Sequence, residues 1–160
     1  DKVRAMIDAG IPVMGHVGLT PQWIHQFGGY KVRGRTADAA KIISEDAKEL
    51  ERAGVFSVVL EGIPWQVAKI ITKSLKVPTI GIGAGPHCDG QVLVLHDMLG
   101  ISDRVPKFVK KYGRIKDAMK KAISDFNREV KEHRFPTLEF CYEMPEEELR
   151  KFRAHARRHG

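Results

Sequence analysis

The segment at residues 55–64, with the sequence VFSVVLEGIP, restricts the possible folds of this chain most strongly. Residues 55–60 are apolar except for Ser57, and a carboxylate follows at Glu61. A short, β-branched run of this kind predicts a strand that is covered on both faces, as in parallel sheets flanked by helices. Glu61 then stands at the carboxyl end of the strand, where parallel α/β folds place their functional side chains.

Glu61 is therefore the first candidate for a functional group. At the end of a covered strand its carboxylate loses part of its hydration, which costs free energy unless a cation, a hydrogen-bond donor or a proton compensates. Position alone equally allows a glutamate that caps a helix or braces a loop. Gly62 predicts a turn of the chain, and Pro64 suits the first turn of a following helix.

Around this strand the sequence alternates between predicted strands and helices. Thr36 can cap a helix over residues 37–53, and Gly54 ends it. A loop is expected at residues 18–22, and an irregular stretch follows through Gly28, Gly29 and Gly34. The other predicted strands are residues 11–17, 77–82 and 91–95, and the other predicted helices are residues 1–10, 64–75, 115–130 and 145–158.

The predicted strands are too few for a closed barrel. The pattern of residues 11–15 (IPVMG) returns at residues 77–81 (VPTIG), and this offset equals two units of roughly 33 residues, close to the βα repeat of a (β/α)₈ barrel. Such a barrel has eight parallel strands, whereas the sequence predicts four. We therefore expect the second half of a barrel, with the first half outside this chain. A four-stranded open sheet is the alternative.

Charge and composition argue against several classes of protein. The 160 residues carry a net charge of +7, and residues 101–160 hold most of it. Basic and acidic residues alternate there at helical spacing, which favours solvated helix faces over a nucleic-acid-binding patch. The chain has no apolar run long enough for a membrane span. Cys88 and Cys141 lack metal-binding spacing, which favours free thiols in a cytoplasmic protein.

Four polar side chains are expected where predicted strands end, and therefore at one edge of the sheet: His16, Glu61, His96 and Asp97. Imidazoles and carboxylates at one edge can form an acid/base site. The sequence has no HxH or HExxH spacing, so we predict no metal ligands among them. The alternative is structural, with His16 as a hydrogen-bonded core histidine and the pair at 96–97 as a cap or brace.

Residues 81–85 (GIGAG) look like a nucleotide-binding glycine loop, but they lack the GxGxxG spacing and Pro86 interrupts them. Residues this small favour a different interpretation, in which a loop or a substrate approaches the backbone closely.

Several segments together resemble the 3-methyl-2-oxobutanoate (ketopantoate) hydroxymethyltransferase family. The similarity covers about residues 1–135 and is most specific at GIGAGPHCDGQVLV. Two departures stand out: Trp23, where the family usually has a small residue, and Phe140-Cys141, where it commonly has His-Ser. The similar segments are residues 10–22 (GIPVMGHVGLTPQ), 28–36 (GGYKVRGRT), 58–64 (VVLEGIP), 78–100 (PTIGIGAGPHCDGQVLVLHDMLG) and 106–112 (PKFVKKY).

The resemblance implies a (β/α)₈ barrel of the phosphoenolpyruvate/pyruvate type, with the last four βα units in residues 1–135 and a helical extension in residues 136–160. It implies transfer of a hydroxymethyl group from 5,10-methylenetetrahydrofolate to 3-methyl-2-oxobutanoate, giving 2-dehydropantoate for pantothenate and coenzyme A synthesis. By resemblance, Glu61 is the catalytic base and His16 contacts the substrate. The implied cofactor is Mg²⁺, with ligands on strands outside this chain. The implied partners are the two small-molecule substrates and further copies in a homo-oligomer, described as a decamer of two pentameric rings.

Two other functions stay open on the sequence. One is a folate-independent, Mg²⁺-dependent lyase or isomerase of 2-oxo acids on the same type of barrel. The other is an inert half-barrel that acts by association, because half of a barrel exposes apolar strand edges and helix faces. The similarity around residues 81–95 favours the hydroxymethyltransferase over the lyase. We expect neither a nucleic acid nor a membrane as a partner.

Overall fold

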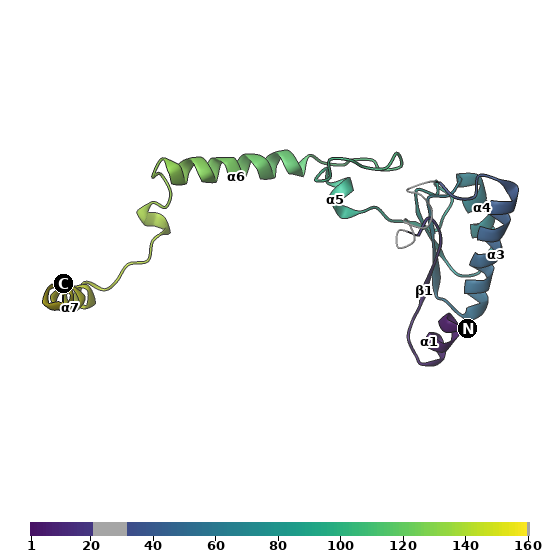
Figure 1. Cartoon of the computed structure of the whole chain (residues 1–160), viewed down its shortest axis with the longest axis horizontal. Helices are drawn as coiled ribbons and strands as arrows, with labels where there is room; N and C mark the ends of the chain where they lie inside the picture. The colour runs from purple at the N-terminus through teal and green to yellow at the C-terminus, as the bar shows by residue number, and fades with distance from the viewer. Residues whose placement is uncertain (21–31, 160) are drawn as a thin grey trace. The chain divides into compact units, whose positions relative to one another are not determined.

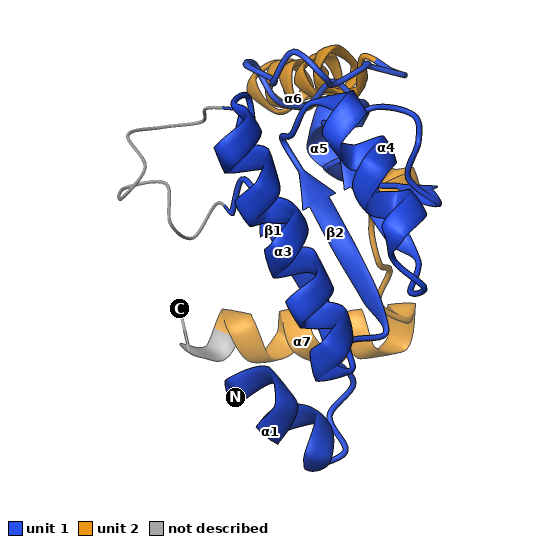
Figure 2. Cartoon of the chain, turned by 90° about the vertical axis from the view of Figure 1, so that its right-hand side faces the viewer, with its two compact units in different colours: residues 1–113 blue, residues 114–160 orange. Residues whose placement is uncertain are grey.

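The structure of this chain is a computed structural model that describes residues 1–20 and 32–159 (Figure 1). The chain divides into two compact units, Asp1–Gly113 and Arg114–Gly160, which Figure 2 shows in different colours. Three features of the sequence analysis lie outside the described residues. They are the end of the loop predicted at residues 18–22, the residue Trp23, and the glycines at 28 and 29 in the predicted irregular stretch. The domain boundary predicted after residue 135 stays a prediction.

Unit 1 is built on a parallel four-stranded sheet in the order β1-β2-β3-β4. Its strands are β1 (Met14–Gly18), β2 (Ser57–Glu61), β3 (Thr79–Ile82) and β4 (Gly90–Gln91). The first three confirm strands predicted from the sequence, and β2 is the predicted central segment. The sheet confirms an α/β fold with parallel strands. Closure into a barrel stays a prediction.

Helices α3 (Ala37–Ala53) and α4 (Trp65–Ser74) lie side by side on one face of the sheet (Figure 1). Helix α3 has the predicted bounds because both ends are capped locally. The Thr36 side chain accepts a hydrogen bond from the Ala39 N–H, and Gly54 adopts a left-handed conformation with φ 98°. Helix α1 (Lys2–Asp8) precedes β1, where the sequence predicted the end of a helix.

The core of unit 1 lies between the sheet and these two helices. The strands supply Val58 and Leu60, which are fully buried, while Ala47, Ala68 and Ile71 come from the helices. Because successive strand residues point to opposite faces, Val59 and Glu61 of β2 point to the other face. That second face carries the candidate site.

The strand predicted at residues 91–95 is wrong for most of its length. Strand β4 ends at Gln91, and after one further backbone bond from Val92 N–H to the Gly81 carbonyl the chain leaves the sheet. The short helix α5 (Leu95–Met98) follows. Val92, Val94 and Leu95 have β-strand character, but β4 is the last strand in the sheet order and these side chains are about half exposed. A strand needs a packed neighbour as well as propensity.

Unit 2 contains helix α6 (Ile115–Lys131), a short 3₁₀ helix (Leu138–Phe140) and helix α7 (Glu146–His159). Both α-helices confirm predicted helices. The rings of Phe126, Phe135 and Phe140 pack in succession, with centroids 5.5 Å apart at each step. Among the described residues, no helix is both long and apolar enough to cross a membrane.

Candidate active site

The parallel register of β1 and β2 brings two of the predicted site residues together. His16 pairs with Val59, and Gly18 pairs with Glu61, so the imidazole and the carboxylate come from the same end of adjacent strands. Nε2 of His16 lies 3.0 Å from Oε2 of Glu61. The sequence placed both residues at strand ends, and the structure confirms this for Glu61, the last residue of β2, whereas His16 is the middle residue of β1. Their catalytic and substrate-binding roles stay predictions.

Backbone hydrogen bonds fix Glu61 from both neighbouring strands. Its carbonyl accepts a bond from the Leu19 N–H at 2.8 Å. The next residue, Gly62, donates its N–H to the Ile82 carbonyl at 2.9 Å and accepts a bond from the Arg33 N–H at 2.9 Å. Gly62 has φ 58°, which fits the turn predicted after the strand. The carboxylate therefore projects from a rigid segment, as a positioned acid/base group requires.

The Glu61 side chain is only 13% exposed, and burial raises its pKa above the usual value of 4.5. The nearby imidazole of His16 acts in the opposite direction and limits that rise. A carboxylate with a raised pKa holds a proton more tightly, so it is a stronger base than a solvated glutamate. These are the properties expected of a group that accepts a proton at neutral pH.

The His16 ring approaches Glu61 without a well-directed hydrogen bond. Nε2 is buried and has no hydrogen-bond partner of suitable angle among the described residues, although Glu61 Oε2 is within ion-pair distance. The distance shows that the two groups are in ion-pair contact, while Nε2 keeps hydrogen-bonding capacity that this contact does not use. A polar atom in this state can bond to a substrate oxygen.

Apolar side chains surround this pair on the open face of the sheet. Val59, Ile80 and Ile82 alternate with residues that face the helices, and each is half-buried. Ile82 pairs directly with Glu61 in the register of β2 and β3. The face therefore offers a branched apolar surface beside one acid/base pair.

An open groove of about 1010 Å³ runs along β1 and α3 and reaches the site at His16. Glu61 is not among its lining residues, so the groove follows the edge of the sheet rather than the acid/base pair. Its walls include Val17, Ile42 and Leu50, and Arg33 and Arg35 line it as well. The sequence reasoning did not single out the two arginines, although both lie in the segment GGYKVRGRT that carries the family resemblance.

The structure does not place His96 and Asp97 at the end of a strand. Both lie in α5, where their main chain takes part in the bonds that close this short helix. The prediction of four polar groups at strand ends is therefore wrong for these two. It failed because the strand before them stops at Gln91.

The glycines at residues 81–85 make room for side chains. A Cβ on Gly83 would lie 2.5 Å from the Phe108 ring, and a Cβ on Gly85 would overlap the side chain of Trp65. Both glycines also have positive φ, at 63° and 80°. The prediction that small residues here allow close approach to the backbone is confirmed.

The described residues do not form a Mg²⁺ site. Across the described part of the chain, no three His, Cys, Asp or Glu side chains gather closely enough to hold a metal ion. Glu61 is a single carboxylate beside an imidazole, whereas Mg²⁺ prefers oxygen ligands in octahedral geometry.

A polar cluster around the buried Thr79, at the opposite end of the sheet, was not foreseen. Asp89 Oδ2 accepts hydrogen bonds from the Thr79 N–H at 2.8 Å and the Thr79 hydroxyl at 3.0 Å. The hydroxyls of Thr79 and Thr72 lie 2.9 Å apart. These bonds hold the pKa of Asp89 below its usual value. Because the cluster lies at the start of β3, it braces the sheet and does not belong to the site.

Comparison with known proteins places the chain in a family. A family model described as "Ketopantoate hydroxymethyltransferase" matches residues 1–138. The chain is 57% identical over 151 residues to the 3-methyl-2-oxobutanoate hydroxymethyltransferase of Syntrophobacter fumaroxidans, covering 94% of this chain and 54% of that protein. It is 58% identical over 137 residues to the protein of the same name from Clostridium acetobutylicum, covering 85% and 50%.

The chain therefore spans about half the length of the curated relatives that it matches. The matched residues include both strands that carry the acid/base pair, and the match continues through α5 and α6. On the extent and identity of these matches, the chain belongs to the ketopantoate hydroxymethyltransferase family.

Proposed function

We propose that this chain carries the acid/base part of a 3-methyl-2-oxobutanoate hydroxymethyltransferase. The observation that supports the proposal is the His16–Glu61 pair, with its 3.0 Å separation, in a chain of this family. The reaction would transfer a one-carbon unit from 5,10-methylenetetrahydrofolate to 3-methyl-2-oxobutanoate. With one water consumed, the products are 2-dehydropantoate and tetrahydrofolate.

Glu61 is proposed as the base that removes the proton from C3 of the 2-oxo acid. Loss of this proton leaves an electron pair that is delocalised into the adjacent carbonyl, and C3 then forms the new carbon–carbon bond to the one-carbon unit. Burial supports this role because it raises the pKa of Glu61 and so strengthens the base. Val59 and Ile82 beside Glu61 offer an apolar surface that suits the branched alkyl group of the substrate.

His16 is proposed to hold the substrate or the new hydroxyl group. Its Nε2 is buried and lacks a well-directed partner among the described residues, so a substrate oxygen could complete its hydrogen bonding. The same imidazole limits the rise in the pKa of Glu61. His16 would therefore act both on the substrate and on the base.

We also propose Mg²⁺ as the cofactor of the complete enzyme, with ligands outside this chain. The donor set around Glu61 does not fit the ion, so none of the steps above is assigned to the metal. The metal, when bound, would supply charge stabilisation for the 2-oxo acid.

We propose that the sheet belongs to a (β/α)₈ barrel that closes along β1. Strand β1 is the first in the sheet order, so one of its edges has no paired strand among the described residues. The groove along that edge has apolar walls, and Ile42 on α3 is 58% exposed. Further βα units would pair with this edge and cover these side chains. Homo-oligomers of the complete protein, including a decamer, belong to this proposal.

In the test, this chain is combined with the segment of the Syntrophobacter fumaroxidans relative that has no counterpart in this chain. Folate-dependent hydroxymethyl transfer by the combined protein is then measured. Glu61→Gln should reduce kcat by at least about 100-fold, the usual effect of losing a general base. Glu45→Gln, an exposed residue on α3, is the matched control and should leave kcat unchanged. A Glu61→Gln variant with the parental rate would refute the role of Glu61. Turnover of the 2-oxo acid without folate would favour the lyase or isomerase instead.

A further inference from the structure

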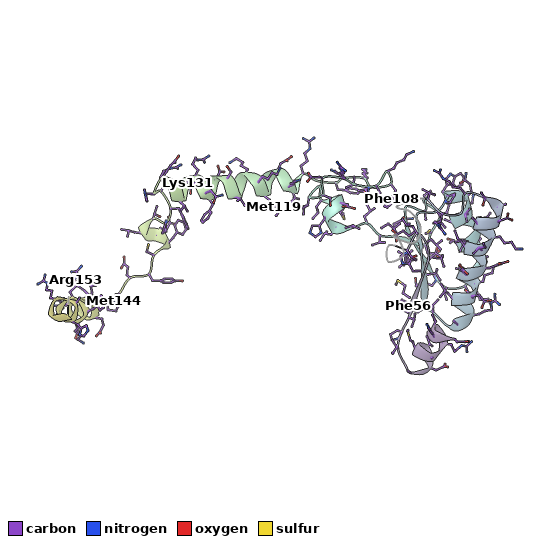
Figure 3. The ribbon with its side chains drawn as sticks, viewed as in Figure 1. Phe56, Phe108, Met119, Lys131, Met144 and Arg153 are labelled. Atoms are coloured by element: carbon purple, nitrogen blue, oxygen red, sulfur yellow. The ribbon has the colours of Figure 1, made fainter. Side chains whose placement is uncertain are left out.

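Helix α7 carries opposite charges on its two halves. Its first turn contains Glu146, Glu147 and Glu148. Basic side chains follow from the second turn onward, among them Arg150, Lys151, Arg153 and Arg157. All of these side chains are exposed, and Figure 3 shows Arg153 projecting from the helix. The order suits the helix dipole, which accounts for the sign at each end. The helix dipole does not account for the apolar residues that lie between the charged ones.

An apolar stripe runs along the same helix. Leu149, Phe152 and Ala156 recur at steps of three and four residues, the spacing of a coiled-coil seam. Phe152 is 60% exposed. A phenylalanine left this open on a helix that is otherwise strongly charged marks a contact surface.

Glu146 and Arg153 flank this stripe on the same side, one heptad apart. No ion pair joins either of them to another described residue, whereas Lys151 bonds to Glu147 at 3.2 Å and Glu148 at 2.8 Å. Seven residues separate Glu146 from Arg153, so they are about 10 Å apart along the helix and do not meet within it. Each has its charge available for a second molecule.

We propose that α7 pairs antiparallel with α7 of a second copy of this chain. A two-fold axis between the helices would set Leu149 of one copy against Phe152 of the other. In an antiparallel pair the same flank of each helix meets its counterpart, so Glu146 of each copy faces Arg153 of the other. The interface would contain each apolar contact and each charge pair twice.

The charge pattern selects this partner over others. In a parallel pair, Arg153 would face Glu148 of the other copy, which Lys151 of its own helix already pairs with at 2.8 Å, and Glu146 would face residue 141, which precedes the helix. A uniformly acidic or basic partner would be repelled by one half of the helix, because like charges in contact are unfavourable. Only a partner with the reversed order of charge fits both halves, and a second α7 in the antiparallel direction has that order. The contact is small, so we expect it to be weak alone. The inference does not depend on the proposed enzymatic activity.

Charge reversal on the whole chain tests the pairing between molecules. Two variants are prepared in a Cys141→Ser background, and each carries Ala156→Cys, which keeps Leu149 and Phe152 in place. Capture uses a bismaleimide that spans about 16 Å, the expected separation of the two copies of residue 156 along the paired helices. Glu146→Arg gives a chain that is basic at both flanking positions, and Arg153→Glu gives one that is acidic at both. Each alone should cross-link about fivefold less than the unreversed chain, because two attractive pairs become repulsive. A mixture of the two should recover the yield, since every pair is then attractive.

The position of the cysteine provides the matched control. A cysteine introduced by Ala154→Cys lies on the opposite side of α7 and should give only the background yield of cross-linked dimer. The chain without an added cysteine defines that background yield. Equal yields from cysteines at positions 156 and 154 would overturn the proposal, and so would a mixture that cross-links no better than either reversed chain alone. Circular dichroism of each reversed chain confirms that the helix content is kept, so a low yield reports pairing. A recovered cross-linking yield in the mixture must come from contact between the two different chains, because each chain is unchanged from the sample in which it was measured alone.

Discussion

His16 Nε2 on β1 and Glu61 Oε2 at the carboxyl end of the neighbouring parallel strand β2 lie 3.0 Å apart, and the imidazole opposes the effect of burial on the pKa of the carboxyl group. Burial has the larger effect, so the pKa of Glu61 stays above its usual value. The folded chain therefore binds the Glu61 proton more tightly than the unfolded chain. It follows that the ionised form of Glu61 lowers the stability of the fold.

This linkage gives a prediction for Glu61→Gln. The cost of the ionised carboxylate is absent below the unfolded pKa and develops as the pH rises from about 4.5 through the raised folded pKa. The variant should thus melt at a higher temperature than the parent near neutral pH, and the advantage should vanish at about pH 4. Thermal denaturation followed by circular dichroism across this range measures the effect. Glu45→Gln should show no such pH dependence, and an advantage of equal size at every pH would contradict the prediction.

Gly18 allows β1 to approach the end of β2, which makes it the most sensitive glycine near the site. It has φ 94°, and an added Cβ would overlap the carbonyl oxygen of Glu61 and lie 2.8 Å from Ile63 Cγ2. Gly18→Ala should destabilise the fold by about 3 kcal/mol, from left-handed strain plus overpacking against backbone. Gly10→Ala is the matched control because Gly10 has φ 81° and an open surrounding, so it should cost only about 1 kcal/mol. Urea denaturation compares them, and equal costs would show that the Glu61 carbonyl moves aside.

Local signals in the sequence predicted the elements whose ends are fixed locally. Helix α3 has the predicted bounds because Thr36 and Gly54 cap it with their own side chain and backbone. Strand β2 needed only its own apolar run to be recognised. Glu61 was placed at a strand end for the same reason, and it is the last residue of β2, whereas His16 lies in the middle of β1. Their 3.0 Å contact required the register between strands that lie far apart in the sequence, which no local pattern contains.

The errors and omissions arose where distant contacts decide the structure. Residues 92–95 have high strand propensity, but no further strand follows β4 in the sheet, and the chain turns into α5 instead. The bonds between Asp89 and Thr79 were missed because each residue alone reads as an ordinary loop or strand residue. Arg33 reaches the site through a backbone bond to Gly62, which becomes visible only once the sheet is assembled.

Asp89 should contribute to stability through the buried groups that it satisfies. Thr79 is fully buried, and both its N–H and its hydroxyl donate to Asp89. Asp89→Ala should cost about 1–2 kcal/mol, because those donors lose their acceptor although water can partly replace it at this exposed position. Asp89→Asn keeps one acceptor oxygen and should cost less.

The same pair has a pH dependence of the opposite sign to that of Glu61. The pKa of Asp89 is lowered by the Thr79 bonds, so its contribution is present above the unfolded value of 3.8 and is lost as the pH falls through the folded pKa. Chemical denaturation at neutral and acidic pH measures both effects. Equal stability of the alanine variant and the parent at neutral pH would show that the bonds contribute nothing.

The Phe108 ring packs directly on Gly83, and a double-mutant cycle can measure the coupling between these two residues. Phe108 is labelled in Figure 3, and an added Cβ at Gly83 would lie 2.5–2.9 Å from three atoms of its ring. Gly83→Ala should therefore carry a steric cost with Phe108 present, in addition to about 1 kcal/mol for its positive φ of 63°. In a Phe108→Ala background the steric part should disappear.

The expected coupling between the two substitutions is about 1–2 kcal/mol, with the double variant more stable than the sum of the single effects predicts. Phe56→Ala is the matched control, because Phe56 is also a half-exposed phenylalanine of unit 1 but precedes β2, at the other end of the sheet. Gly83→Ala and Phe56→Ala should add within about 0.5 kcal/mol. Additivity of Gly83→Ala with Phe108→Ala would mean that the ring shifts without cost, and the role of Gly83 would then be confined to its backbone conformation.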